Sequence, residues 1–141
     1  MTRIQTATAA LPVNADALYA FLSDLSNHRA FLEPGAQGFV GEADRHSYFI
    51  EVMGMKMPQE FVVKERVPGQ RIVLVAGARK LFDHELTFEI AADSEGCSLH
   101  LVDEADIPMM MATMGADRLL QGQLDSALIG IQALAREGRL T

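Results

Sequence analysis

The feature that most constrains this chain is a change of hydrophobic period along it. Between Gly38 and Ile107 apolar and polar residues alternate, and clusters of turn-forming residues interrupt the alternation at short intervals. On either side of this region apolar residues recur every three to four positions, as in amphipathic helices. The chain is therefore predicted to form one strand, two short helices, six further strands and one long C-terminal helix.

The N-terminal segment predicts a strand followed by a pair of helices. Residues 3–11 alternate weakly and end at Pro12, which favours a strand. Asn14 is expected to cap the first helix and Ser26 the second, shorter one. The second helix must end before Pro34, because proline restricts the residue ahead of it and has no N–H to donate.

The last helix is expected to run unbroken from about Met109 to Glu137. One stripe of this helix is expected to face the sheet, and it holds Met110, Thr113, Asp117, Leu120, Leu124, Leu128, Ile131 and Ala135. Small residues form a second stripe nearly opposite, at Gly115, Gly122, Ser126, Gly130 and Ala133. This second stripe is either a thin solvent face or a surface that another element can approach closely.

Composition narrows the classes of function. The chain has 141 residues and a net charge of -7, and its 12 Lys and Arg are scattered, so nucleic-acid binding is not expected. The length suits a single domain over residues 1–141. Cys97 is the one cysteine, and no secretory segment is recognisable, so a cytoplasmic location is expected. No apolar run is long enough to span a bilayer, although transient membrane contact stays open.

Three short motifs carry a family resemblance: residues 10–16 (ALPVNAD), residues 21–24 (FLSD) and the pair Pro34-Gly35. Together they resemble the opening of the START, polyketide cyclase and birch-pollen-allergen superfamily, also called SRPBCC. The resemblance implies an α+β helix-grip fold, in which a seven-stranded antiparallel sheet wraps around the long C-terminal helix, with two short helices after strand 1. It also implies a ligand cavity between sheet and helix. Members bind lipids, sterols, quinones, hormones or polyketides, and some are cyclases, dehydratases or co-chaperones. They share no universal catalytic residue, so none is transferred here.

Residues on the inner face of the strands and on the last helix are expected to contact the ligand. They are Tyr48, Ile50, Val52, Phe61, Val63, Phe82, His84, Leu86, Phe88, Leu101, Asp103, Met110, Thr113, Met114, Asp117, Leu120 and Leu124. Asp117 interrupts the apolar stripe and either meets a ligand hydroxyl or lies in solvent. No metal is expected, since the histidines lack zinc-site spacing, and no cofactor is expected either.

Seven methionines fall in two short segments, at 53–57 and 109–114. In the resembled fold both segments lie at one end of the sheet, so they are expected to rim the cavity opening, unless they merely fill gaps in the core. The expected rim consists of Met55, Lys56, Met57, Arg79, Lys80 and Met109. Its cations would suit an anionic headgroup, or they are simply solvated.

The pair His84 and Asp103 is the candidate for chemistry. A hairpin that places Ile90 opposite Cys97 would place His84 opposite Asp103 on the inner face. A carboxylate beside an imidazole can support a general base or a polar ligand anchor, or it can be a purely structural pair.

Three functions are therefore compatible with the sequence. The first is binding of a small hydrophobic or amphiphilic molecule such as a lipid, a quinone or a polyketide-like compound. The second is a cofactor-free cyclase or dehydratase that uses His84 and Asp103. The third is a co-chaperone-like interaction module. The sequence does not define the oligomeric state.

Overall fold

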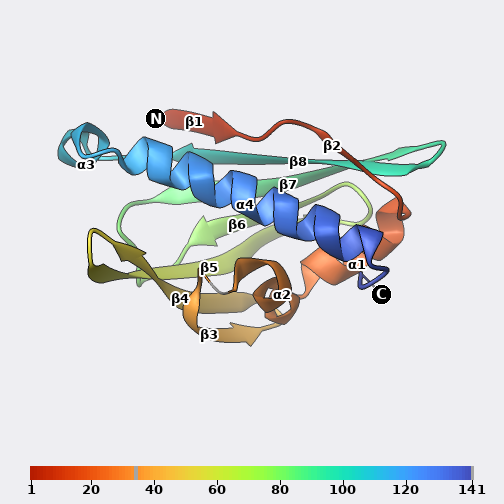
Figure 1. Ribbon diagram of the computed structural model, residues 1–141, viewed down its shortest axis with the longest axis horizontal. Coiled ribbons are helices and arrows are strands. Elements are labelled where there is room, and N and C mark those ends of the chain that lie inside the picture. Colours follow the sequence, from red (N-terminus) through yellow and green to blue (C-terminus); the bar gives the residue numbers. More distant parts are fainter. Residues whose placement is uncertain (34, 141) are drawn as a thin grey trace.

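The computed structural model describes residues 1–33 and 35–140. An antiparallel sheet curves around one long helix that crosses its inner face (Figure 1). The strands are β1 (Thr2–Gln5), β2 (Ala9–Leu11), β3 (Gln37–Glu42), β4 (Arg45–Val52), β5 (Met55–Val67), β6 (Arg71–Ala76), β7 (His84–Asp93) and β8 (Gly96–Ala105). The helices are α1 (Ala15–Ser23), the 3-10 helix η1 (Leu25–His28), α2 (Arg29–Leu32), α3 (Met109–Thr113) and α4 (Ala116–Arg136). The predicted helix-grip arrangement is confirmed.

The strand order is β1-β8-β7-β6-β5-β4-β3, and β2 pairs with β8 beside β1. The expected first strand, residues 3–11, is therefore two pieces. Thr6 explains the interruption, because its side-chain oxygen accepts a hydrogen bond from the Leu101 N–H at 3.1 Å. A side chain thus takes the place of a backbone carbonyl in the ladder.

Local capping decides where the short helices begin. Asn14 caps α1 as predicted, since its Oδ1 accepts a 2.7 Å hydrogen bond from the Ala17 N–H. The prediction that Ser26 caps the next helix is wrong. Asp24 caps η1 instead and accepts from the Ser26 N–H at 3.0 Å. Helix α2 ends at Leu32, and Pro34 lies outside the described residues.

The last helix is broken, in contrast to the continuous helix expected over 109–137. Gly115 adopts a left-handed conformation with φ of 91°, which separates α3 from α4. Helix α4 has 21 residues and is about 31 Å long. The expected sheet-facing stripe is buried only within α4, at Leu120, Leu124, Leu128, Ile131 and Ala135.

The predicted register of the last hairpin is wrong by two residues. Ile90 lies opposite Leu99 rather than Cys97, and His84 lies opposite Ala105 rather than Asp103. A shift of two residues keeps every side chain on its face of the sheet, whereas a shift of one would reverse it. The prediction of which residues face inward in this hairpin therefore survives the error.

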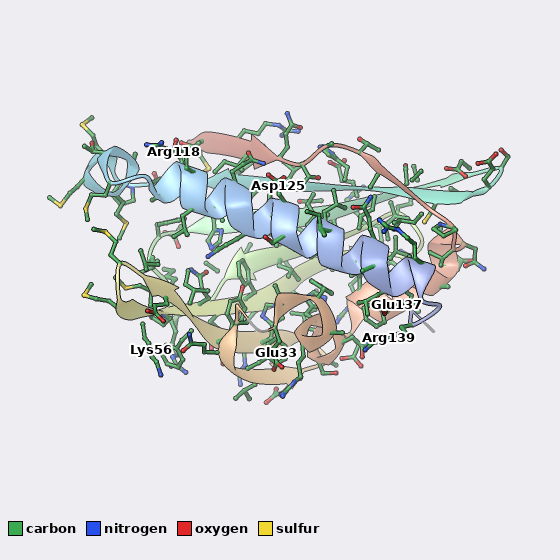
Figure 2. All side chains as sticks on the ribbon, in the orientation of Figure 1. Glu33, Lys56, Arg118, Asp125, Glu137 and Arg139 are labelled. Atoms are coloured by element: carbon green, nitrogen blue, oxygen red, sulfur yellow. The ribbon has the colours of Figure 1, made fainter. Side chains whose placement is uncertain are left out.

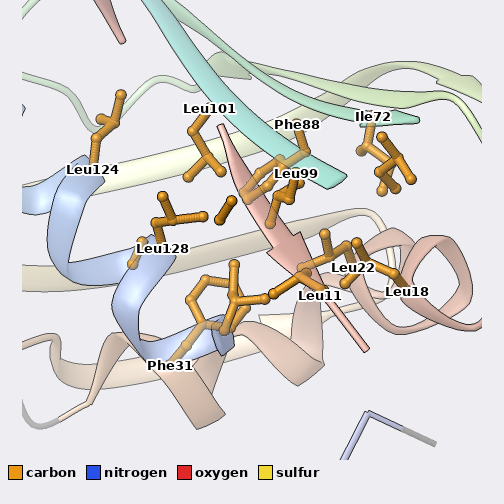
Figure 3. Close-up of a cluster of buried hydrophobic side chains, with 14 of the residues drawn as sticks. Leu11, Leu18, Leu22, Phe31, Ile72, Phe88, Leu99, Leu101, Leu124 and Leu128 are labelled. Atoms are coloured by element: carbon orange, nitrogen blue, oxygen red, sulfur yellow. The ribbon is translucent and has the colours of Figure 1, made fainter. Parts of the chain in front are cut away.

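Within residues 1–33 and 35–140, two separate apolar clusters fill the interior. The larger cluster lies between α1, α4 and the strands around β8 (Figure 3), and it includes Leu18, Phe88 and Leu128. The smaller cluster consists of Ala36, just before β3, Phe39 on β3, and Tyr48 and Ile50 on β4. None of the described helices is both long and apolar enough to cross a bilayer.

Candidate functional site

Three hollows lie along the face of α4 that looks toward β4, between the two apolar clusters. We name them the α2 cavity, of about 580 Å³, the methionine cavity, of about 360 Å³, and the inner cavity, of about 40 Å³. Gln123 of α4 lines all three, so they meet around this side chain. The larger two can hold a drug-sized ligand, and the inner one has room for a single polar group.

The α2 cavity opens between α2, the start of β3 and the middle of α4. Its lining is mostly apolar or small, and comprises Phe31, Leu32, Gly35, Ala36, Gln37, Tyr48, Ile50, Glu51, Arg118, Leu119, Gly122, Gln123, Ser126 and Ala127. Gly122 contributes to the space directly, since a Cβ there would meet no atom within 4 Å. Gly130 on the same stripe packs closely against Phe31 instead. The small-residue stripe therefore leaves space for the α2 cavity at Gly122 and allows close helix packing at Gly130.

The methionine cavity lies at the N-terminal end of α4, beside the β4–β5 turn and α3. Its lining comprises Ile50, Glu51, Val52, Met53, Met57, Gln59, Leu81, Phe82, His84, Met111, Met114, Gly115, Ala116, Leu119, Leu120 and Gln123. The predicted meeting of the two methionine segments is therefore observed, and Figure 2 shows their sulfur atoms gathered at this end. Flexible thioether side chains suit a surface that adapts to varied apolar shapes.

The inner cavity lies beneath the other two. It is enclosed by His28, Phe31, Leu32, His46, Tyr48, Phe61, Leu86, Phe88, Leu101, Asp103, Leu120, Gln123, Leu124 and Ala127. Five of these residues also line the α2 cavity, so a group bound there could extend inward. Buried polar groups at such a point are normally paired.

His84 and Asp103 form a buried pair, as predicted, although by a diagonal contact. His84 Nδ1 lies 2.8 Å from Asp103 Oδ2, and the two side chains are 4% and 0% exposed. Burial raises the pKa of Asp103, and the hydrogen bond from His84 opposes that rise. His84 lines the methionine cavity. Because its Nδ1 is bonded to Asp103, its Nε2 is the ring nitrogen that can interact with a ligand there.

A second histidine pair lies deeper, and sequence reasoning missed it. His28 Nε2 lies 2.8 Å from the carbonyl oxygen of Leu22, and His28 Nδ1 lies 3.1 Å from His46 Nε2. A carbonyl only accepts, so His28 Nε2 carries a proton, Nδ1 accepts, and His46 Nε2 donates. His46 Nδ1 is then an unprotonated acceptor, and it has no partner among the described residues.

Burial keeps this second pair uncharged. Desolvation, reinforced for His28 by the neighbouring His46, lowers the pKa of His28 to about 3. Desolvation likewise lowers the pKa of His46 to about 4. His46 alternates with Tyr48 and Ile50 on β4, a signal that could have placed it in the cavity. His28 gave no such signal, because only the η1 turn brings it inward.

Most of the predicted ligand-contacting residues line one of the three cavities. Those that do are Tyr48, Ile50, Val52, Phe61, Phe82, His84, Leu86, Phe88, Leu101, Asp103, Met114, Leu120 and Leu124, together with the predicted rim residue Met57. Val63 packs against the larger apolar cluster instead. Met110, Thr113 and Asp117 line none of the three and are exposed, whereas Met111, Met114 and Ala116 beside them line the methionine cavity. For Asp117, the solvent alternative holds.

The predicted cationic rim is not formed. Lys56 is exposed on β5, in register with Glu51, and it lines none of the three cavities (Figure 2). The guanidinium of Arg79 stacks on Phe49, 5.2 Å from the centre of the ring, and Lys80 pairs with Asp83 at 2.8 Å. Met55 and Met109 are exposed at this end without lining the cavity. Among the described residues, Arg118 is instead the one arginine or lysine that lines any of the three cavities.

The chemistry available is therefore acid–base and hydrogen-bonding chemistry inside an apolar enclosure. Within residues 1–33 and 35–140, no group of three or more His, Cys, Asp or Glu side chains is placed to hold a metal ion. Cys97 is buried in the larger apolar cluster, and burial raises the pKa of its thiol, which opposes thiolate formation.

Comparison with known proteins supports the architecture. No family model matches the chain, and no curated protein matches it. Solved structures do. TTHA0849 from Thermus thermophilus has a TM-score of 0.76 at 16% identity, covering 97% of this chain and 99% of that one. A START superfamily protein from Mycobacterium smegmatis has a TM-score of 0.68 at 16% identity, covering 96% and 97%.

A third similar structure is the di-domain ARO/CYC StfQ from the steffimycin biosynthetic pathway. Its TM-score is 0.72 at 18% identity, and the match covers 96% of this chain and 52% of StfQ. These identities are low, so the similarity bears on fold and leaves function open. The sheet, the gripped helix and these structural neighbours together identify the chain as having the SRPBCC-like helix-grip fold.

Proposed function

We propose that this protein binds a small hydrophobic or amphiphilic molecule between α4 and the sheet, as one domain over residues 1–141 and in the cytoplasm. The observation that carries the proposal is the pair of large cavities that meet at Gln123. Apolar surface removed from water contributes about 25 cal/mol per Å² to affinity, so this lining can retain a lipid, a quinone or a polyketide-like molecule. Structural neighbours named as a START protein and an ARO/CYC support this class.

Native mass spectrometry of the purified protein, followed by denaturing extraction, is the first test. Titration with Nile red, a neutral apolar dye, is the second, because the dye fluoresces more strongly in an apolar site. The substitution Gly122→Phe adds a ring into open space in the α2 cavity and should weaken dye binding at least about tenfold.

Ile129→Phe is the matched control, since Ile129 lies on the same helix, is 64% exposed and lines none of the three cavities. Equal dye affinity in both variants, with no copurified molecule in the extract, would contradict binding between helix and sheet.

A cofactor-free enzyme of the cyclase or dehydratase type is the second candidate, and the His84–Asp103 contact favours it. His84 Nε2 would remove a proton from a carbon next to a carbonyl group, while Asp103 orients the ring. A synthetic poly-β-ketone should then be cyclised with a pH-dependent rate that His84→Ala abolishes. Binding without turnover in the wild-type protein would exclude this candidate.

A further inference from the structure

The inner cavity contains two buried hydrogen-bond acceptors that have no partner among the described residues. What they imply about the ligand rests on the proposed binding function. One acceptor is His46 Nδ1, and the other is Asp103 Oδ1. His46 is 3% exposed and Asp103 is 0% exposed, and both line the inner cavity. An unpaired buried polar group is costly, so this point of the fold is energetically suited to receive hydrogen-bond donors.

The tautomer of His46 is set by backbone geometry. The carbonyl of Leu22 fixes the proton on His28 Nε2 at 2.8 Å, and the 3.1 Å contact then fixes the proton on His46 Nε2. His46 can therefore present only a lone pair to the cavity while the pair stays neutral. The ring is held on several sides by aromatic neighbours, with ring centroids 5.5 Å from Phe39 and 5.6 Å from Phe61.

The second acceptor reinforces the first. Asp103 uses Oδ2 in the 2.8 Å contact with His84, which leaves Oδ1 directed at no protein donor within the part of the chain that the structure describes. The surrounding cavity has a volume of about 40 Å³, which is enough for a hydroxyl or an amino group but too little for a ring. A ligand carboxylate would be repelled in the inner cavity, because its oxygens accept hydrogen bonds and would face the two acceptors His46 Nδ1 and Asp103 Oδ1.

From this geometry we infer that the ligand carries a hydrogen-bond donor at its buried end, while its apolar body fills the neighbouring cavities. A hydroxyl, which has one proton, donates to His46 Nδ1, and an amino group can donate to both His46 Nδ1 and Asp103 Oδ1. The body would lie mainly in the α2 cavity, which shares Phe31, Tyr48 and Gln123 with the inner cavity. An anionic group, where a ligand has one, belongs at the opposite end beside Arg118.

Three probes of one shape test this inference: naphthol, naphthalene and methoxynaphthalene. Naphthol can donate, naphthalene can neither donate nor accept, and methoxynaphthalene can only accept. Calorimetric titration should give naphthol an affinity about tenfold above that of naphthalene, with methoxynaphthalene weakest, as expected for one buried hydrogen bond. Equal affinity of all three probes would overturn the inference and leave the proposed function standing. This is the result expected if water alone occupies the two acceptors. Binding of none of the three would count against the proposed function itself.

A double variant tests the assignment to the histidines. His28→Leu combined with His46→Leu removes the whole acceptor chain without leaving His28 Nδ1 unpaired, and should reduce the naphthol preference toward the naphthalene value. His46→Gln, whose amide can donate to His28 and still present an oxygen, should keep most of the preference.

Nitrogen NMR of the wild-type protein gives a readout that does not depend on how the variants fold. The His46 Nδ1 resonance should have the shift of an unprotonated nitrogen and should move when naphthol is added. A protonated Nδ1, or no movement on saturation with naphthol, would overturn the inference.

Discussion

At the residue scale, the two deep histidines link stability to pH. The pKa of His28 lies at about 3 and that of His46 at about 4, mainly because burial disfavours the charged imidazolium. An unfolded histidine titrates near 6.5, so below that pH the unfolded chain binds more protons than the folded one. Stability from these residues is therefore complete above about pH 6.5 and is lost progressively as the pH falls toward 4 and below.

The first prediction follows from this difference in proton binding. Lowering the pH from 7 to below 4 should reduce the free energy of unfolding by about 3 kcal/mol through His46 alone, since its pKa shift is from 6.5 to about 4. Urea unfolding followed by circular dichroism at several pH values measures this change. The variant His46→Phe should show a shallower dependence between about pH 6.5 and 5, where few carboxylates titrate. Identical slopes in the two proteins would contradict the assignment.

The second residue-scale prediction concerns the His84–Asp103 pair. Replacing His84 with Leu should destabilise the fold by about 3 kcal/mol, because it leaves both carboxylate oxygens of Asp103 buried without a donor among the described residues. Replacing both residues with Leu should cost less than this single change, since no polar group then remains unpaired. Urea unfolding of the two single variants and the double variant gives the coupling energy. Additive costs would show that the two side chains are energetically independent.

These residues also show what the sequence could predict about the site. The His84–Asp103 contact was predictable because alternation fixes the face of each residue even when the register is wrong by two. The His28–His46 contact was not, because it depends on the turn of η1 and on tertiary packing between elements 18 positions apart. Arg79 was misplaced because turn residues give no periodic signal for their direction. Lys56 was misplaced because the sequence did not show that β5 already begins at Met55.

At the element scale, the glycines of α4 have opposite roles. A Cβ on Gly122 would meet nothing within 4 Å, whereas one on Gly130 would lie 2.9 Å from Phe31 Cβ. Helix α4 can therefore approach α2 closely at Gly130 and leaves the α2 cavity open at Gly122. Gly115 has a third role, because its positive φ ends the helical path between α3 and α4.

The third prediction is a contrast between two alanine substitutions in α4. Gly122→Ala should stabilise the fold by about 0.5 to 1 kcal/mol, because alanine loses less backbone entropy in a helix and meets no neighbour here. Gly130→Ala should destabilise it by about 1 to 3 kcal/mol, because the added methyl overpacks against Phe31. Thermal unfolding of the two variants beside wild type measures the difference. Equal effects in the same direction would contradict the close approach of α2 to α4.

The elements themselves were largely predictable, and their ends were not. Alternation and turn residues located the six strands from Gly38 onward, and Asn14 located the start of α1. The break at Gly115 was missed because a glycine within an apolar helical pattern is often tolerated. That break separates Met110 and Thr113 from the stripe that continues in α4, whereas Asp117 lies within α4 and is exposed there.

At the scale of the whole molecule, the cavities exist because the sheet is wider than the surface that one helix can cover. The larger apolar cluster fills the region around β8 and α1, and the smaller one lies apart on β3 and β4. The element order was enough to predict this architecture. The position and volume of the cavities were not predictable, because they depend on side-chain rotamers of residues such as Phe31 and Tyr48.

The fourth prediction uses this uneven packing. Hydrogen exchange should be slowest in the β7–β8 hairpin, whose inner face packs in the larger cluster, and faster in the β4–β5 hairpin beside the methionine cavity. Saturation with Nile red should slow exchange in β4 and in residues 116–124 of α4, with little effect on the tip of β7–β8, because the bound dye restricts the elements that line its site. The Gly122→Phe variant should lose this protection in α4. Uniform slowing across the sheet, or protection confined to β7 and β8, would place the dye outside the cavities between α4 and β4.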